Sequence, residues 1–145
     1  MRDKFAEFGG VVPALLSQIT SPQRVIFNAL DEVYQAPPWH RGRVVLIGDA
    51  VHASSPFLAQ GGAMAIEDAV VLAELLTAGG PYADMMSAFA ARRYERCNFV
   101  QIASRKNGVD AHNEDAATAT ARDAKIPLHA QAALDQFYAR LAVPI

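Results

Sequence analysis

The order of apolar and polar positions predicts one well-defined strand, preceded by weaker ones. Residues 43–49 (RVVLIGD) form a continuous apolar run that ends in Gly-Asp, without the alternation of a half-exposed strand. Such a run is typical of a strand that is covered on both faces. Val25, Phe27 and Ala29 alternate as in an edge strand, so residues 24–34 predict two short strands.

A strand with both faces buried needs paired neighbours and two covering layers. The sequence offers only the strand at 43–49 and the two weaker candidates. We therefore expect this strand either to enter the sheet of another chain or to belong to the C-terminal part of a larger protein.

Helices account for most of the remaining pattern, because apolar residues recur at helical spacing between Gly, Pro and Asn-Gly breakers. The predicted helices span 2–8, 11–19, 61–78, 82–104 and 128–142, and the predicted loops span 35–42, 50–60 and, with weak helix, 109–127. Gly79-Gly80-Pro81 ends the third helix, and Asn107-Gly108 ends the fourth. The side chains expected to face inward are Ile66, Val70, Ala73 and Leu76 or Thr77, then Phe89, Tyr94, Cys97 and Val100 or Ile102, and finally Leu134, Phe137, Tyr138 and Leu141.

Composition narrows the class of protein. The 145 residues are 52% apolar and 19% charged, which is typical of a globular domain. The formal net charge of −2 offers no basic surface for nucleic acid. The single cysteine, Cys97, can form no internal disulfide, so a reducing, cytoplasmic location is expected. We expect neither a secretory signal nor a membrane span, because the longest apolar stretches are too short.

The Gly48-Asp49 pair falls at the carboxyl end of the predicted strand, where ligands bind in open α/β sheets. Gly48 lets a ligand approach the backbone, and the Asp49 carboxylate suits a donor such as a polyol hydroxyl. Gln60, Gly61 and Gly62 begin the next helix, where free N–H groups and the helix dipole favour an acceptor or a developing negative charge. A flavin has both features, ribityl hydroxyls and an N1–C2=O edge that becomes negative on reduction. The dipeptide taken alone also fits a simple turn and helix cap.

A longer pattern supports the flavin interpretation. The segment W..GRVVLIGDAVHASSPFLAQGGAMAIEDAVVLAELL, about residues 37–76, closely resembles the second FAD-binding motif of the class A flavoprotein monooxygenases, the aromatic-ring hydroxylases of the p-hydroxybenzoate hydroxylase type. Within it, LAQGGAMAIEDA is most similar to the salicylate- and urate-hydroxylase-like branch. The segment ARRYERCNFVQIASR at 91–105 is similar to the helix that comes next in the family.

The resemblance implies roles for individual residues. It implies that Asp49 binds the ribityl O3 of FAD and that Pro56 lines the flavin edge near the reacting position, with no side chain certain to act as a catalytic acid or base. The cofactor-binding residues that it implies are Arg43, Gly48, Asp49, Pro56, Gly61, Gly62 and Ala63, the last three through backbone N–H groups at the pyrimidine edge. It gives His52 and Glu67-Asp68 supporting roles. Ala59 stands where many members have Gly, and Gly62 where many have Ala.

The resemblance also implies the fold. We expect an α/β, helix-rich chain that is the C-terminal portion of an FAD/NAD(P)-binding Rossmann-like domain. No GxGxxG follows an N-terminal strand, since EFGGVV does not fit that fingerprint, and the upstream DG motif and substrate-binding sheet of the family are missing. The domain should therefore be incomplete without an N-terminal βαβ unit. Its expected parts are lead-in helices and short strands at 1–36, the strand, FAD motif and helix at 37–80, and C-terminal helices at 81–145.

The implied activity is that of the family. NAD(P)H reduces FAD, O2 forms a flavin C4a-hydroperoxide, and one oxygen atom reaches an aromatic or heteroaromatic substrate. Because the cofactor carries this chemistry and the ADP half of its site is missing, we expect the chain to be inactive alone. The alternative is a non-catalytic remnant that acts as a helical interaction protein and keeps the motif only as part of its fold.

Other site types fit the sequence less well. Asp49, His52 and Ser54 or Ser55 lie too close together for a hydrolase triad, and no GxSxG elbow is present. The four histidines, His40, His52, His112 and His129, lack metal-ligand spacing.

Charged residues on the two long helices have simple interpretations. Glu67 and Asp68 are adjacent, so they should face different ways, and early acidic residues favour the helix dipole. Arg92, Arg93 and Arg96 could grip phosphate, but a solvated or ion-paired helix face is the favoured interpretation. His52 is expected to bond to nearby backbone, and Cys97 to lie in the core.

Overall fold

The computed structural model describes residues 2–113 and 115–145, which fall into two compact units, Met1–Leu30 and Asp31–Ile145. In the described part of the first unit, the regular elements are short helices. They are η1 (Asp3–Phe5), α1 (Val12–Gln18) and η2 (Pro22–Arg24). The helix predicted at 11–19 is thus confirmed, whereas the one predicted at 2–8 is reduced to a single 3-10 turn.

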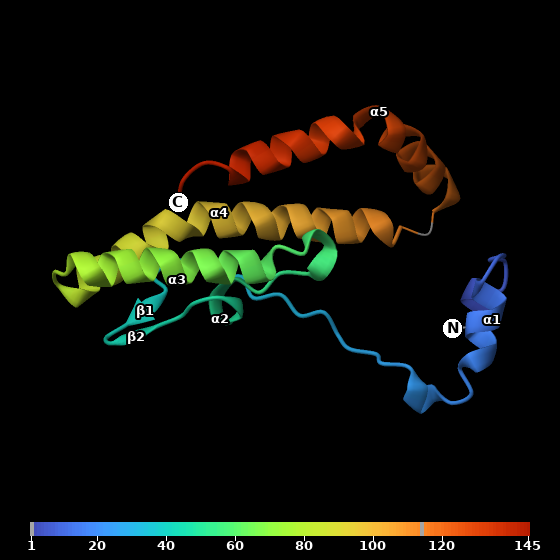
Figure 1. The fold of residues 1–145 in the computed structure, drawn as a ribbon, viewed down its shortest axis with the longest axis horizontal. Coiled ribbons are helices and arrows are strands. Elements are labelled where there is room, and N and C mark those ends of the chain that lie inside the picture. Colours follow the sequence, from blue (N-terminus) through green and yellow to red (C-terminus); the bar gives the residue numbers. More distant parts are fainter. Residues whose placement is uncertain (1, 114) are drawn as a thin grey trace. The chain divides into compact units, whose positions relative to one another are not determined.

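The second unit carries a two-stranded sheet and three long helices (Figure 1). Its elements are β1 (His40–Arg41), β2 (Val44–Val45), α2 (Asp49–His52), η3 (Pro56–Leu58), α3 (Gly61–Ala78), α4 (Tyr82–Ala111) and α5 (Ala116–Leu141). The strands pair antiparallel, with His40 opposite Val45, across a turn in which Gly42 has a φ of 58°. The helix-rich composition of the prediction is confirmed in this unit, with a small sheet.

The core lies between α3 and α4, which pack side by side (Figure 1). Its buried apolar members are Trp39, Val51, Met64, Val71, Phe89, Ala90, Cys97 and Val100. Trp39 is the largest of these, and its indole N–H donates to the Gln35 carbonyl at 2.8 Å. The Trp39 ring meets Phe89 edge-on, with ring centroids 5.9 Å apart. This ring therefore joins the segment before β1 to α4.

The strand predictions require correction. The strand expected over 43–49 is only Val44–Val45, and Val44 is 66% exposed rather than covered on both faces. The two strands expected over 24–34 do not form, and Phe27 is 93% exposed. The reason is the same in both cases: among the described residues, β2 has only β1 as a hydrogen-bonded neighbour, and extended segments need such neighbours to form a sheet.

One loop prediction and one helix end require correction, and the weak helix expected within 109–127 is more extensive than predicted. Residues 50–60, expected as a loop, contain helical turns in α2 and η3. The helix α4 does not stop at Asn107-Gly108 but continues to Ala111, and most of 109–127 is helical. Gly108 is buried, and a Cβ there would overlap the Phe57 ring of η3. Gly108 therefore serves the close packing of α4 against Phe57 and does not end the helix. Here tertiary packing outweighs the low helix propensity of Asn107-Gly108.

The predicted extent of the helix α3 is confirmed, but the prediction of its buried face is wrong. Its buried side chains are Met64, Asp68 and Val71, which face α4. Ile66 and Val70, expected to face inward, are 69% and 45% exposed. A helix that is apolar on both sides is typical of one that is covered on both sides. One of these faces has no cover among the residues that the structure describes.

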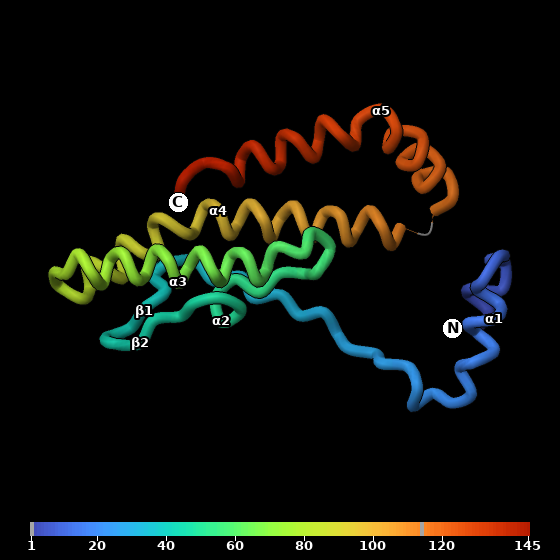
Figure 2. Tube along the Cα trace, viewed as in Figure 1, coloured from blue at the N-terminus to red at the C-terminus, as the bar shows by residue number. Residues whose placement is uncertain are grey.

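The helix α5 runs back along α4 and changes direction along its length (Figure 2). Pro127 lies inside this helix, where it removes one backbone hydrogen bond and gives a physical cause for the bend. Phe137 and Leu141 are partly buried, as expected, whereas Leu134 and Tyr138 are largely exposed. The C-terminal half of α5 is thus held to α4 by a narrow contact, which includes Phe99 and Phe137 at a centroid distance of 5.4 Å.

Candidate functional site

The Gly48-Asp49 pair forms the connection from β2 into α2. Gly48 has a φ of 56° and a ψ of −138°, a backbone conformation that residues other than glycine rarely adopt. Gly48 is also buried, and a Cβ there would lie 3.4 Å from the Cβ of Ala65 in α3. The turn therefore brings the end of the strand against the first turns of α3.

Asp49 is the first residue of α2, and it is exposed. Within the described part of the chain, its carboxylate has no hydrogen-bond or ion-pair partner. An ionised carboxylate with free lone pairs can accept hydrogen bonds from a ligand.

The N-terminus of α3 presents donors near the same turn. The first helical hydrogen bond runs from the Met64 N–H to the Gln60 carbonyl at 3.0 Å, which leaves the N–H groups of Gly61, Gly62 and Ala63 outside the helical pattern. Gln60 caps none of them through its side chain. These three amides and the helix dipole can therefore stabilise an acceptor or a negative charge.

Pro56 and Arg43, the other two predicted site residues, are both exposed. Pro56 begins η3, between Asp49 and the start of α3 in the chain. Arg43 lies in the β1–β2 turn, where its carbonyl accepts a hydrogen bond from Tyr82 at 3.1 Å. Among the described residues, no hydrogen bond or ion pair joins the Arg43 side chain to the Gly48–Asp49 turn.

A buried cluster of charged residues lies behind this turn, and the sequence analysis did not anticipate it. Asp68 is completely buried, and its Oδ2 accepts from the Gly48 N–H at 2.8 Å and from His52 Nε2 at 2.7 Å. Its Oδ1 accepts from Arg93 Nε at 2.8 Å. His52 thus bonds to a helix carboxylate rather than to backbone. Asp68 lies on the same face of α3 as the apolar Met64 and Val71. A charged residue on an apolar helix face was the sequence signal that could have predicted the cluster.

Glu67 extends the cluster to a second arginine. Arg93 Nη1 donates to Glu67 Oε2 at 2.6 Å, while Arg96 donates to both Glu67 oxygens at 2.7 and 2.6 Å. The adjacent carboxylates Glu67 and Asp68 therefore share Arg93, contrary to the expectation that they face different ways. The ion-paired interpretation of these arginines is confirmed, but Arg93 is fully buried rather than solvated.

The cluster perturbs the ionisation of its members. Burial lowers the pKa of His52, but the hydrogen bond to Asp68, with a smaller effect of Cys97, outweighs burial and raises that pKa to about 9. Burial raises the pKa of Asp68, but the hydrogen bonds from His52, Gly48 and Arg93 outweigh it and hold that pKa below its usual value. At neutral pH the pair is therefore an imidazolium and a carboxylate.

Two alternative site types can be judged from these contacts. The donor atoms of His52, Asp68 and Cys97 lie within 4.8 Å of one another, which is close enough for a metal ion. However, both Asp68 oxygens already accept hydrogen bonds, and the Arg93 guanidinium lies 3.6 Å from Cys97 Sγ. A permanent positive charge inside the cluster disfavours a cation there.

The same contacts argue against a hydrolase triad. His52 is paired with Asp68, and Ser55 with Ser104 at 3.2 Å, so neither forms a hydrolase triad with Asp49.

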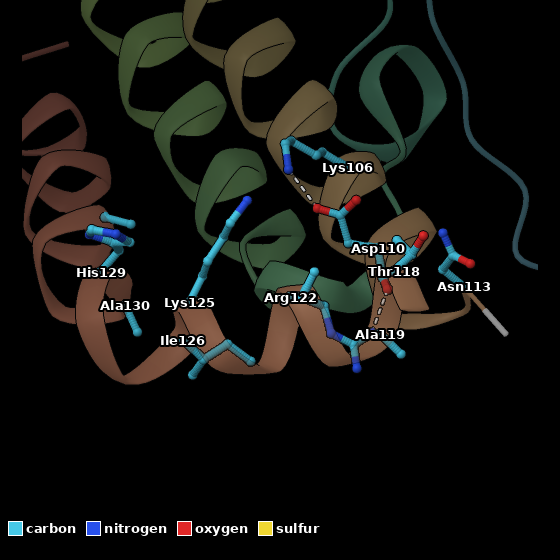
Figure 3. A pocket seen from close by; sticks show the side chains of 12 residues that line it. Lys106, Asp110, Asn113, Thr118, Ala119, Arg122, Lys125, Ile126, His129 and Ala130 are labelled. Carbon is cyan, nitrogen blue, oxygen red and sulfur yellow. Dashed lines mark hydrogen bonds and ion pairs between the residues drawn. The ribbon is translucent and has the colours of Figure 1, made fainter. Parts of the chain in front are cut away.

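A separate hollow of about 500 Å³ lies between the end of α4 and the first half of α5 (Figure 3). Its charged or titratable lining residues are Lys106, Asp110, Arg122, Lys125 and His129. None of the predicted cofactor-binding residues lines this hollow. It is therefore distinct from the Gly48–Asp49 turn.

Comparisons with known proteins place the segment around this turn in a class of proteins. Residues 18–80 match the model of the FAD binding domain family, and this range includes the sheet, the Gly48–Asp49 turn and α3. The matched segment is that of an FAD binding domain, and the relatives that the chain resembles include FAD-dependent monooxygenases. The resemblance read from residues 37–76 is thus confirmed, and the cofactor of this family is FAD.

Individual members of the family are similar over longer stretches. YetM of Bacillus subtilis, named as an FAD-dependent monooxygenase, is 52% identical over 77 residues, which are 53% of this chain and 21% of that protein. The 6-hydroxynicotinate 3-monooxygenase of Pseudomonas fluorescens is 39% identical over 110 residues, 74% of this chain and 29% of that enzyme. The FAD-dependent urate hydroxylase of Klebsiella oxytoca is 32% identical over 113 residues, 76% of this chain and 29% of that enzyme.

The chain spans less than a third of the length of these relatives. In the part of the chain that the structure describes, no helix combines the length and apolarity needed to cross a membrane.

Proposed function

We propose that this chain forms one wall of the FAD site of a flavoprotein monooxygenase and is inactive by itself. The observation that carries the proposal is the combination of an exposed Asp49 carboxylate and three amides at the start of α3, none of which has a hydrogen-bond partner among the described residues. A carboxylate that accepts and amides that donate match the two polar faces of a flavin nucleotide, its ribityl hydroxyls and its pyrimidine edge.

In this arrangement Asp49 accepts a hydrogen bond from the ribityl chain, and Gly48 lets the cofactor approach the backbone. The N–H groups of Gly61, Gly62 and Ala63 stabilise negative charge at the pyrimidine edge, and Pro56 and Arg43 line the cofactor. When bound, FAD supplies the redox chemistry, with NAD(P)H as reductant and O2 as the source of the inserted oxygen atom. The chain's own residues bind and orient the cofactor and supply the electropositive helix end.

The fold that we propose is the C-terminal portion of a Rossmann-like domain, with 1–36 as a lead-in, 37–80 as the cofactor motif and 81–145 as C-terminal helices. Apolar side chains on β2, directly after it and on α3 support this proposal. Val44, Leu46 and Ile47 after β1, and Ile66 and Val70 on α3, are between 38% and 69% exposed. An N-terminal βαβ unit, from the same protein or another chain, would cover them and supply the missing strands.

The substrate that we propose is an aromatic or heteroaromatic compound, which is hydroxylated in the cytoplasm. The names of the relatives support this class, since they include a hydroxynicotinate monooxygenase and a urate hydroxylase.

A cofactor titration tests the proposal. The purified chain is mixed with FAD, alone and together with a polypeptide that carries the N-terminal βαβ unit of a relative, and flavin absorbance and fluorescence are recorded. We expect weak or no binding to the chain alone, and a shifted spectrum with quenched fluorescence when the partner is added. Stoichiometric FAD on the chain alone would contradict its incompleteness. Failure of every such partner to produce binding would favour the non-catalytic interaction protein.

A further inference from the structure

A continuous series of hydrogen bonds connects the Gly48–Asp49 turn with the end of α5. It begins at the Gly48 N–H, which donates to Asp68, and continues through Arg93 to Glu67. Glu67 binds Arg96, which is the outermost member of the series. Each link joins residues at least 20 positions apart in the sequence, so the series depends wholly on the packing of α3, α4 and α5.

The Arg96 guanidinium binds two sets of partners, the Glu67 carboxylate and backbone carbonyls near the end of α5. Nε and Nη2 bind the two Glu67 oxygens, while Nη1 donates to the Val143 carbonyl at 3.1 Å and Nη2 to the Leu141 carbonyl. The last carbonyls of a helix lack partners within it, so Arg96 caps the C-terminus of α5. One side chain on α4 therefore holds both α3 and the end of α5.

The inner links leave little freedom for independent movement. Asp68 and Arg93 are completely buried, and Arg96 is 15% exposed. A buried charge that loses its partner is strongly unfavourable. When one side chain of the series moves, the charged side chains bonded to it should therefore move with it. Because Asp68 holds the backbone of Gly48, the residue before Asp49, the position of the Asp49 carboxylate depends on this series.

We propose that Arg96 is a positioning residue through which the docked end of α5 sets the geometry of the Gly48–Asp49 turn and hence the affinity for FAD. The part that concerns FAD rests on the proposed function. The part that concerns the turn is a property of this chain alone, so the two can be tested separately.

The test compares Arg96→Gln with a matched control, Arg92→Gln. Arg92 lies one turn earlier on α4 and also holds the C-terminal segment, donating to the Ile145 carbonyl at 2.8 Å, but its carboxylate partner is the exposed Glu74 rather than Glu67. Arg96→Lys keeps the charge but cannot bind two oxygens of Glu67 and two carbonyls in the same planar geometry. It should therefore give an intermediate result, and it takes the place of Arg96→Gln if that variant does not fold.

The first readout is amide hydrogen exchange of residues 48–52 in the chain without FAD. We expect exchange there to accelerate about tenfold in Arg96→Gln and to stay unchanged in Arg92→Gln. A tenfold change is typical of a moderate coupling free energy, here between Arg96 and the turn. Faster exchange in α5 with unchanged exchange at 48–52 would overturn the inference, because Arg96 would then only anchor the helix.

The second readout is the FAD dissociation constant of the complex with the N-terminal partner. It should rise about tenfold in Arg96→Gln and remain unchanged in Arg92→Gln. An unchanged constant in Arg96→Gln would overturn the link to cofactor affinity. If the unaltered complex binds no FAD, the proposed function fails, while the exchange experiment still decides whether Arg96 controls the turn.

Discussion

The backbone N–H of Gly48 donates a hydrogen bond of 2.8 Å to the buried Asp68 carboxylate, 20 residues along the chain. This bond separates the roles of two acidic residues at the same turn. Asp68 is saturated by Gly48, His52 and Arg93, whereas the neighbouring Asp49 remains exposed and unpartnered among the described residues. The first carboxylate holds the turn in place, and the second is left free for a ligand.

Replacement of Asp49 by alanine should weaken FAD binding without unfolding the protein. Loss of one hydrogen bond to a charged group costs about 1.5–3 kcal/mol, so the dissociation constant of the complex with the N-terminal partner should rise roughly 10- to 150-fold. Fluorescence quenching measures the affinity, and thermal melting followed by circular dichroism checks the fold. Asp84→Ala, at an exposed acidic residue in the first turn of α4, is the control. Unchanged affinity in Asp49→Ala would remove Asp49 from the cofactor site.

The His52–Asp68 pair should make stability depend on pH in the alkaline range. The pKa of His52 is about 9 in the folded protein and 6.5 ordinarily. Its contribution is therefore complete below about pH 6.5 and is lost as the pH rises through about 9. Since the side chain is almost fully buried, the loss should amount to about 3 kcal/mol.

Denaturant unfolding of the unaltered chain and of His52→Gln, between about pH 6 and pH 10, measures this effect. The difference in unfolding free energy between the two proteins should shrink as the pH rises. A difference that stays constant across this range would show that His52 is neutral in the folded protein.

Gly108 should resist replacement although it lies inside a helix. Gly→Ala in a helix interior normally stabilises by about 1 kcal/mol, but here the new Cβ would overlap the Phe57 ring. Overpacking of this kind costs about 1–3 kcal/mol, so Gly108→Ala should lower the free energy of unfolding. Gly62→Ala is the matched control, because nothing lies within 4 Å of its added Cβ. Equal or greater stability of Gly108→Ala would mean that Phe57 moves aside at no cost.

Ala59 carries backbone strain that glycine should relieve. Its φ of 53° lies in the left-handed region, which costs a residue with a Cβ roughly 1–2 kcal/mol. Ala59→Gly should raise the free energy of unfolding by about 0.5–1 kcal/mol, since part of the gain is offset by the freedom of glycine in the unfolded chain. Ala63→Gly, in the first turn of α3, should act in the opposite direction, and denaturant titration distinguishes the two. A lower stability in Ala59→Gly would show that this turn is not strained.

The sequence by itself indicated the resemblance to FAD-dependent monooxygenases, the extent of the helix α3 and the Gly48–Asp49 pair that precedes it. These features are local. A glycine, an acidic residue directly after it and free amides at the start of a helix all belong to one short segment, 48–63. The residue types of such a segment can be recognised without knowing what packs around it, which is why Gly48, Asp49 and Gly61–Ala63 could be named before their geometry was known.

Only the tertiary structure decided which face of α3 is buried and how the charges behind the turn are paired. Ile66 and Met64 are both apolar, so periodicity could not distinguish the face toward α4 from the exposed one. The bond between Asp68 and Arg93 joins residues 25 positions apart, and no spacing rule along one helix reaches that far. Burial of a charge becomes favourable only when its partners arrive from other elements, and their arrival is a property of the packed helices rather than of the local sequence.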